Sequence, residues 1–400
     1  MASRLPAPLA PLFPRLKPVY TQATRALAPF TRRLSRIRGG YLPSGSVASL
    51  DESVADAGGR IWAVRGEEHV TRATPSGEPP RHATFMDHAE FTQPPLAVAE
   101  LPNGRVLGKH RVVVDRRGRM IEELGLYWGT KRYSEHEVFW HPFPDPPLEV
   151  DGALGVLAGR GDLNWYHFLL DIVPRLALFD EPGVPTPERW YLPLGHEWQR
   201  DVFELVGLLP NDGAIDADAV PHVQAEKLLV PGLPDFNVTA PWTVAFIRER
   251  LRPAGLERVP GRRIYLTRGN KRNNRIVRNE PELLEMLADR GFTVVDTGAL
   301  SVAEEIRTFG EAEWIVAPHG AALTNLLFAS PGASVIELFA PDYVTPSYWK
   351  LADCVPGLEY RYLLGAGRSP RNGDMNGVMS DITIDLAAVE RAIDSLPVAA

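Results

Sequence analysis

The spacing of apolar and polar positions between residues 95 and 127 is that of short strands. Runs such as 96–100 and 111–114 are separated by Asn103-Gly104 and Arg117-Gly118. Short runs joined by dipeptides of this kind are typical of β-hairpins. The sequence therefore predicts a hairpin-rich segment here.

From residue 153 onward, apolar runs alternate with amphipathic segments, which predicts strands alternating with helices. A buried strand at 154–158 precedes a helix at 163–172, which we expect Pro174 to end. The segment 75–80, Pro-Ser-Gly-Glu-Pro-Pro, has the composition of a loop. Other expected elements are strands at 191–194 and 227–231 and helices at 197–208 and 241–252.

After residue 260 the alternation is regular. Local signals mark the helix ends: Asn279 and Gly291 bracket one helix, and Ser301 with Glu304 has the spacing of a capping box. Strands joined by helices form parallel sheets through right-handed crossovers, so this half is expected to be Rossmann-like. The expected strands are 263–267, 292–296, 313–317, 334–339 and 359–364, and the expected helices are 280–290, 302–309, 320–328 and 346–354.

Composition narrows the class of protein. A chain of 400 residues with 44% hydrophobic and 23% charged residues is expected to form two or three globular domains. The net charge of -7 argues against nucleic acid as a partner. A single cysteine, Cys354, excludes an internal disulfide framework and a thiolate metal cluster. We expect a cytoplasmic protein.

The first 45 residues form a basic, proline-rich tail. Leu27, Phe30, Leu34 and Ile37 recur at helical spacing, and no acidic residue precedes Asp51. One interpretation is an amphipathic helix near Pro29 that lets residues 1–40 contact the inner face of the plasma membrane peripherally. The other is a solvated tail without a partner. Basic residues in it are Arg4, Arg15, Lys17, Arg25, Arg32, Arg33, Arg36 and Arg38.

Two loops at expected strand ends carry candidate anion-binding groups. Ligands of open α/β sheets bind beyond the carboxyl ends of the strands. The loop after strand 263–267 has no acid among its basic residues, and guanidinium groups suit phosphate oxygens; a solvated loop is the alternative. These basic residues are Arg262, Arg263, Arg268, Lys271, Arg272, Arg275 and Arg278.

The second loop runs through His319-Gly320-Ala321-Ala322 into a helix. Small residues allow backbone N–H groups to approach a ligand, and a helix N-terminus favours negative charge. A tight turn with a surface histidine is the alternative. Glu337 lies within an apolar strand, where an unpaired carboxylate is costly. We expect it either to reach a ribose diol or to pair with an arginine of the basic loop.

In the first half, Asn164, His167 and Asp171 share one face of the expected helix. A histidine and a carboxylate four residues apart suit a general base or a phosphate contact. The alternative is a helix cap with a core histidine. Asp216-Ala217-Asp218 matches a metal-binding Asp-X-Asp pattern, but its turn-like surroundings favour a solvated loop.

Four ordered blocks resemble glycosyltransferase family 61 and its capsular-polysaccharide relatives. They are residues 161–176, Thr267-Arg268 through Asn279-Glu280, His319 through Asn325, and Val335 through Leu338. The resemblance covers roughly residues 95–365. Thr267 replaces the usual serine, and residues 269–274 are richer in amides than the family pattern, which leaves the pairing of each arginine with a phosphate oxygen open.

The resemblance implies a GT-B-like α/β fold, in which two Rossmann-like domains face a cleft and a hairpin-rich segment precedes the first. The implied domains are the tail 1–45, an acceptor-side domain 46–245, a nucleotide-sugar domain 246–385 and a C-terminal helix 386–400. The implied activity is inverting transfer from a UDP-sugar, or another nucleotide sugar, to a glycan or polysaccharide acceptor without an obligatory metal or cofactor. A sugar-nucleotide epimerase or hydrolase and a non-catalytic nucleotide-sugar-binding scaffold remain alternatives.

The same resemblance implies roles for individual residues. His167 would reach the diphosphate from the acceptor-side domain, and Asp171 would act as base or contact the acceptor. Acceptor-side positions are Asn164, Trp165 and Arg175. Donor-binding positions are Arg268, Arg272, Arg275, His319, Gly320, Ala321, Ala322, Asn325 and Glu337.

Overall fold

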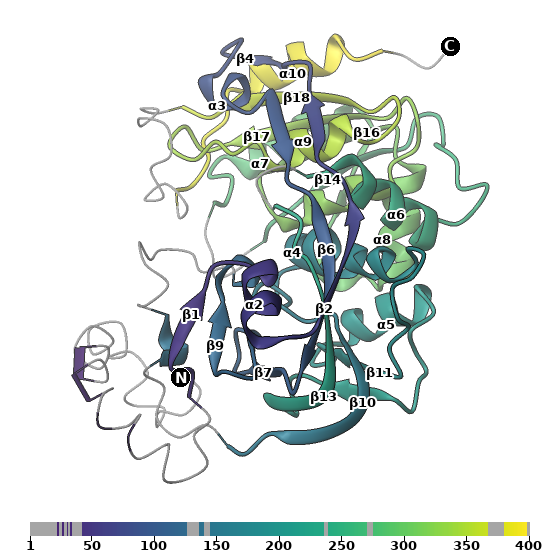
Figure 1. Ribbon diagram of the computed structural model, residues 1–400. Helices are drawn as coiled ribbons and strands as arrows, with labels where there is room; N and C mark the ends of the chain where they lie inside the picture. Colours follow the sequence, from purple (N-terminus) through teal and green to yellow (C-terminus); the bar gives the residue numbers. More distant parts are fainter. Residues whose placement is uncertain are drawn as a thin grey trace, which may run out of the picture.

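The computed structural model describes most of the chain as two sheets with their helices (Figure 1). The described residues are 42–125, 136–139, 145–235, 239–269, 275–366 and 380–397, with 22–23, 26–27, 30 and 33 of the tail. Most of the expected amphipathic helix near Pro29 lies outside them; Leu27 and Phe30 are described and are exposed. No described helix has the length and apolar character needed to cross a membrane.

The sheet of the first half has ten strands and is mixed. Its centre is parallel: β10 pairs in parallel with β13 and β11, and β11 pairs in parallel with β12. The strands are β1 (Gly45–Val47), β2 (Arg60–Arg65), β6 (Leu96–Pro102), β7 (Arg105–Leu107), β8 (Val112–Val114), β9 (Arg119–Ile121), β10 (Leu148–Val156), β11 (Arg189–Leu192), β12 (Ala214–Asp216) and β13 (His222–Pro231).

The hairpin prediction for residues 95–127 is confirmed at one turn and wrong at the other. Gly118 lies in the turn of the β8–β9 hairpin, where it has a positive φ. The chain does not reverse at Asn103-Gly104. Instead, β6 and β7 follow one another along β13, and both pair antiparallel with it. The register against β13 is the same on both sides of this dipeptide: Pro102 faces Lys227 and Arg105 faces Gln224. Local turn signals therefore do not distinguish a reversal of the chain from a turn-like pair along a strand that continues in the same direction.

The helical segment after β10 continues past Pro174, contrary to the expectation. It consists of α4 (Trp165–His167), the π-helical η6 (Phe168–Ile172) and the 3-10 η7 (Val173–Phe179). Pro174 lies in the first turn of η7, where a missing N–H costs no helical hydrogen bond. Other helices of this half are α2 (Leu50–Ala57), η3 (Glu122–Leu124), η5 (Glu137–Phe139), α5 (Glu197–Leu205) and α6 (Pro241–Leu251).

The second sheet is parallel throughout, with strand order β15-β14-β16-β17-β18-β4. The expected Rossmann-like alternation is confirmed. The strands are β14 (Arg263–Leu266), β15 (Phe292–Val295), β16 (Trp314–Pro318), β17 (Ser334–Phe339) and β18 (Glu359–Leu364), and the helices are α7 (Glu280–Asp289), η8 (Thr297–Ala299), α8 (Val302–Glu311), η9 (Ala321–Phe328), α9 (Ser347–Asp353) and α10 (Leu386–Asp394).

A segment from the first half of the chain completes this second sheet. β4 (Ser76–Glu78) pairs with β18, so the loop prediction for residues 75–80 is wrong. In α3 (Ala83–Met86), the fully buried Phe85 packs against Tyr362 and Trp349. Figure 1 shows β4 and α3 beside α10 and β18, at the opposite end of the molecule from β1, β7 and β9. The remaining strands, β3 (Glu68–Thr71) and β5 (Glu90–Gln93), form a separate pair.

One apolar core runs through both halves. It includes Phe168 and Val244 of the first half and Leu323 and Leu326 of η9, all fully buried. Because the halves share a close-packed interior, the helical segment at 165–179 has a defined position against the second sheet.

Candidate active site

Two loops of the second sheet meet at its topological switch point. The chain passes from β14 to β15 on one side and then places β16 on the other side of β14. Arg268 follows β14 and His319 follows β16, and the Arg268 Nη1 atom donates a hydrogen bond to the His319 carbonyl oxygen at 2.8 Å. The crevice beside such a switch point is where open α/β sheets bind ligands. The two candidate anion-binding loops therefore lie side by side.

Gly320 permits this approach of Arg268. A Cβ atom at position 320 would lie 1.9 Å from Arg268 Nη1, so a side chain there requires the guanidinium to move. The first helical bond of η9 runs from Leu323 N to Gly320 O. The amides of Ala321 and Ala322 therefore precede the hydrogen-bonded turn, as expected for donors at a helix start.

His319 is buried among aromatic rings. Its ring centroid lies 5.1 Å from that of Phe339, 5.4 Å from that of Tyr343 and 5.2 Å from that of Tyr348. Its Nε2 atom lies 3.5 Å from Thr345 Oγ1. Burial lowers the pKa of His319 well below its usual value, and the charges of Arg275 and Arg268 act in the same direction.

The hydrogen-bond partners of Glu337 are His319 and Tyr360, and not an arginine of the basic loop; its contact with a ribose diol stays a prediction. Glu337 is fully buried, its Oε1 atom lies 2.5 Å from His319 Nδ1, and Tyr360 donates its hydroxyl proton to Oε2. Burial raises the pKa of Glu337 well above its usual value, opposed by the Tyr360 hydrogen bond and by Arg275. Neighbouring strands supply both partners, which a single strand's sequence cannot reveal.

Only part of the basic loop faces this site. Arg275 has a left-handed backbone, φ 65°, and its guanidinium carbon lies 5.1 Å from the ring centroid of Tyr343. Arg262 and Arg278 instead form ion pairs with Glu311 and Asp381. Residues 270–274, which include Lys271 and Arg272, lie outside the described residues. Arg268 and Arg275 are therefore the described cations at the switch point.

The first half contributes a second histidine–carboxylate pair. His167 Nδ1 lies 2.6 Å from Asp171 Oδ2 within the helical segment. Asp171 is 2% exposed and burial raises its pKa, with the His167 hydrogen bond opposing the shift. The His167 side chain retains 16% exposure. Asn164 caps α4 through Tyr166 N at 3.0 Å, which is the structural role that the sequence left open for it.

Aromatic contacts connect this pair to His319. The Tyr166 ring lies 5.2 Å from His167 and 5.7 Å from Tyr348, which in turn contacts His319. Tyr166 and Tyr348 thus form a chain of ring contacts from His167 in the first half to His319 in the second. The sequence did not indicate this role for either tyrosine, because only packing brings them together.

Three residues that were expected to contact ligands bond within the protein. Trp165 Nε1 donates to Asn325 Oδ1 at 3.0 Å, and Asn325 Nδ2 donates to Glu305 at 3.0 Å. Arg175 is 3% exposed, donates to the Pro231 carbonyl at 2.6 Å, and has its pKa lowered to about 10 by burial. These contacts anchor the side chains of Trp165, Asn325 and Arg175 within the protein, and their contacts with ligands stay predictions.

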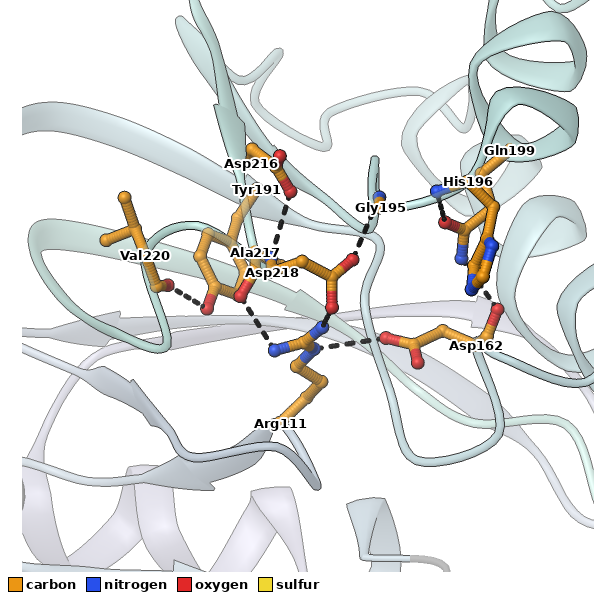
Figure 2. A network of polar contacts seen from close by, with 10 residues as sticks. All are labelled: Arg111, Asp162, Tyr191, Gly195, His196, Gln199, Asp216, Ala217, Asp218 and Val220. Atoms are coloured by element: carbon orange, nitrogen blue, oxygen red, sulfur yellow. Dashed lines mark hydrogen bonds and ion pairs between the residues drawn. The ribbon is translucent and has the colours of Figure 1, made fainter. Parts of the chain in front are cut away.

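A polar network also fixes the loop that leads into α4 (Figure 2). The buried Arg111 guanidinium bonds to Asp162 Oδ2 at 3.1 Å, to the Ala217 carbonyl at 2.7 Å and to Asp218 Oδ1 at 2.5 Å. Asp218 lies in an exposed turn, as the sequence predicts, and also bonds to an arginine 107 positions earlier in the chain. Among the described residues, no group of three or more His, Cys, Asp or Glu side chains has the arrangement of a metal site.

Comparison with known proteins defines the class of this chain. Residues 165–336 match the model of the family described as Glycosyltransferase 61. This match spans the helical segment, the basic loop, η9 and the first half of β17. The chain carries a glycosyltransferase family 61 domain, and the class of enzyme that this domain defines is the glycosyltransferases.

Particular relatives share a shorter region. The protein is 33% identical over 115 residues to protein O-linked-mannose beta-1,4-N-acetylglucosaminyltransferase 2 of Bos taurus and to that of Homo sapiens. The match covers 27% of this chain and 20% of each relative. The Mus musculus protein of the same name is 34% identical over 106 residues, or 25% of this chain and 18% of the relative. The matches thus span about a fifth of the length of these curated relatives.

Proposed function

We propose that this protein transfers a sugar from a nucleotide-sugar donor, with UDP as the first candidate nucleotide, to a hydroxyl group of a glycan. One observation supports the proposal above all: Arg268 and His319 meet at the switch point of a parallel sheet. Guanidinium groups and the start of η9 there suit a diphosphate. In this proposal the second sheet binds the donor and the first half faces the acceptor, as in a GT-B arrangement.

We assign the base to His167. Its Nδ1 atom is held by the buried Asp171, so the second ring nitrogen is the one oriented towards an acceptor. Nε2 removes the hydroxyl proton, the acceptor oxygen bonds to the anomeric carbon, and the sugar–phosphate bond breaks with its electron pair leaving on UDP. Asp171 stabilises the resulting imidazolium. Its burial favours this orienting role over direct contact with the acceptor.

The leaving diphosphate gains negative charge as the sugar departs. Arg268, Arg275 and the η9 amides are fixed before reaction and stabilise that charge without a divalent metal. Attack from the face opposite UDP inverts the anomeric carbon. The relatives' name, which specifies a β-1,4 product, supports inversion, since a β-linked product requires it when the donor sugar is α-linked.

The test uses the purified full chain with UDP, UDP-N-acetylglucosamine and other nucleotide sugars. UDP is expected to raise the melting temperature, because a ligand that binds only the folded state stabilises it. UDP release that depends on an added glycan, together with a product heavier by one sugar, supports transfer. Activity should persist in EDTA.

Two results would overturn the proposal. A new sugar isomer, or donor hydrolysis at an undiminished rate without acceptor, identifies an epimerase or hydrolase. Stable UDP binding without transfer to any glycan in a broad panel identifies a binding protein.

For location, we propose a cytoplasmic protein that contacts anionic membranes through residues 1–40. The supporting observation is the excess of basic residues in that segment. Sedimentation with phosphatidylserine vesicles should fall when these residues are deleted. Unchanged sedimentation contradicts the membrane contact and leaves the proposed transfer unaffected.

A further inference from the structure

The buried contact between His319 and Glu337 has a feature that donor binding alone does not explain. Glu337 is 0% exposed and has two partners: His319 Nδ1 at 2.5 Å and the Tyr360 hydroxyl. A buried carboxylate that only filled the strand interior would be replaced at lower cost by an apolar side chain. Its position behind the ring of His319, away from the Nε2 atom, indicates that it acts through the histidine.

The hydrogen bonds of Glu337 limit where the protons of the His319–Glu337 contact can be. The Tyr360 hydroxyl donates to Glu337 Oε2, so the remaining oxygen, Oε1, shares one proton with His319 Nδ1. If the pair as a whole is neutral, the second imidazole proton must be on Nε2. This holds whether the shared proton rests on the carboxyl group or on the ring. Either way, His319 has an N–H donor on its opposite edge, where Thr345 Oγ1 is 3.5 Å from Nε2.

The surroundings favour a neutral pair. Arg268 and Arg275 act on His319 from the loop after β14, and Tyr343 and Tyr348 contact its ring from the segment after β17. Two cations and a buried site both disfavour an imidazolium. Burial also raises the pKa of Glu337, which favours its carboxylic acid form.

We propose that Glu337 is a positioning residue that keeps His319 Nε2 protonated and lends His319 a second proton during transfer. The inference rests on the proposed function. As the sugar–phosphate bond breaks, charge develops on the leaving oxygen beside Nε2–H. The shared proton moves from Oε1 to Nδ1, which makes an imidazolium facing the phosphate. The carboxylate left behind is stabilised by the Tyr360 hydroxyl, and no proton is taken from solvent.

The decisive variants are Glu337→Gln and Glu337→Leu. In the glutamine variant, the amide oxygen accepts from Tyr360 and the NH₂ group donates to Nδ1, so Nε2–H remains but no proton can move. UDP affinity should stay within about 3-fold of wild type while kcat falls on the order of 10²-fold. Leucine removes both bonds, so both UDP affinity and kcat should fall.

Nitrogen-15 NMR of histidine-labelled protein reads the protons directly, with His319→Ala identifying the signals. Wild type without nucleotide should show His319 protonated on Nε2, and UDP should shift it towards imidazolium. The glutamine variant should keep the Nε2 proton and remain neutral with UDP.

An unliganded wild type with Nε2 unprotonated at neutral pH overturns this inference, whether or not UDP binds. So does a glutamine variant with wild-type kcat, or one that loses UDP affinity as fully as the leucine variant. Failure of the proposed function has a separate sign: wild type binds no nucleotide sugar even though its His319 carries the expected proton.

Discussion

The two halves of the molecule each contain a histidine whose Nδ1 atom faces a buried carboxylate. His167 and Asp171 are four residues apart in one helical segment, whereas His319 directly follows β16 and Glu337 lies in the neighbouring parallel strand β17. His167 retains 16% side-chain exposure, and His319 retains 7% among aromatic rings and close to two arginines. The same pair of groups therefore suits opposite tasks: a base beside an acceptor, and a donor beside a phosphate.

Removing the first pair should have the largest effect. His167→Ala removes the proposed base, so kcat should fall roughly 10³-fold. Asp171→Asn keeps the volume but weakens the imidazolium, and its kcat should fall in the same direction. UDP-induced thermal stabilisation should persist in both variants, since the protein groups proposed to bind the diphosphate belong to the second half. Loss of UDP binding in His167→Ala would show that the two pairs do not have separate tasks.

Removing Arg268, which lies beside the His319–Glu337 pair, should weaken binding of the nucleotide donor. Arg268→Ala removes a charge-assisted contact to phosphate, which corresponds to about 10- to 100-fold weaker UDP binding. Arg262→Ala is the matched control, because Arg262 pairs with Glu311 at 3.5 Å rather than facing the switch point. Isothermal titration with UDP measures both variants. Equal losses in the two variants would mean that general positive charge, and not the position of Arg268, binds the nucleotide.

Asp162, which lies in the loop before the His167–Asp171 pair, should titrate in mildly acidic solution. Burial raises the pKa of Asp162 to about 6, with Arg111 opposing the shift, whereas the usual value is 3.8. Folded protein thus binds more protons than unfolded protein between these values, and this contribution to stability declines as pH rises from 4 to 6. The unfolding free energy of wild type relative to Asp162→Asn should change by about 2–3 kcal/mol over that window. Urea unfolding from pH 4 to 7 measures it, and parallel curves would contradict it.

Two glycines allow a finer comparison of the halves. A Cβ at Gly161, where φ is 112°, would lie 2.9 Å from His167 Cβ, and one at Gly320 would meet Arg268. Gly161→Ala should lower kcat, and Gly320→Ala should weaken UDP binding, each by about 10-fold if the neighbouring side chain is displaced by roughly an ångström. Gly45→Ala is the control, since nothing lies within 4 Å of its added carbon. Identical phenotypes in the first two variants would remove the distinction between the halves.

The sequence alone determined the secondary structure of the second half and the two loops of its switch point. The reason is local: strand and helix periodicities, caps and small residues act over a few positions. The His167–Asp171 pair was also accessible, because helical spacing fixes which side chains share a face. Boundaries there agree with the structure to within a few residues.

Tertiary structure alone decided which polar groups are partners. Glu337 contacts a histidine 18 positions away, Asp218 contacts an arginine 107 positions away, and Phe85 packs against residues more than 250 positions later. It also anchored the side chains of Asn325 and Arg175 within the protein and left Arg268 and Arg275 at the switch point. Such pairings follow from strand order and burial, which bring distant residues together after the chain has folded. No local pattern encodes them.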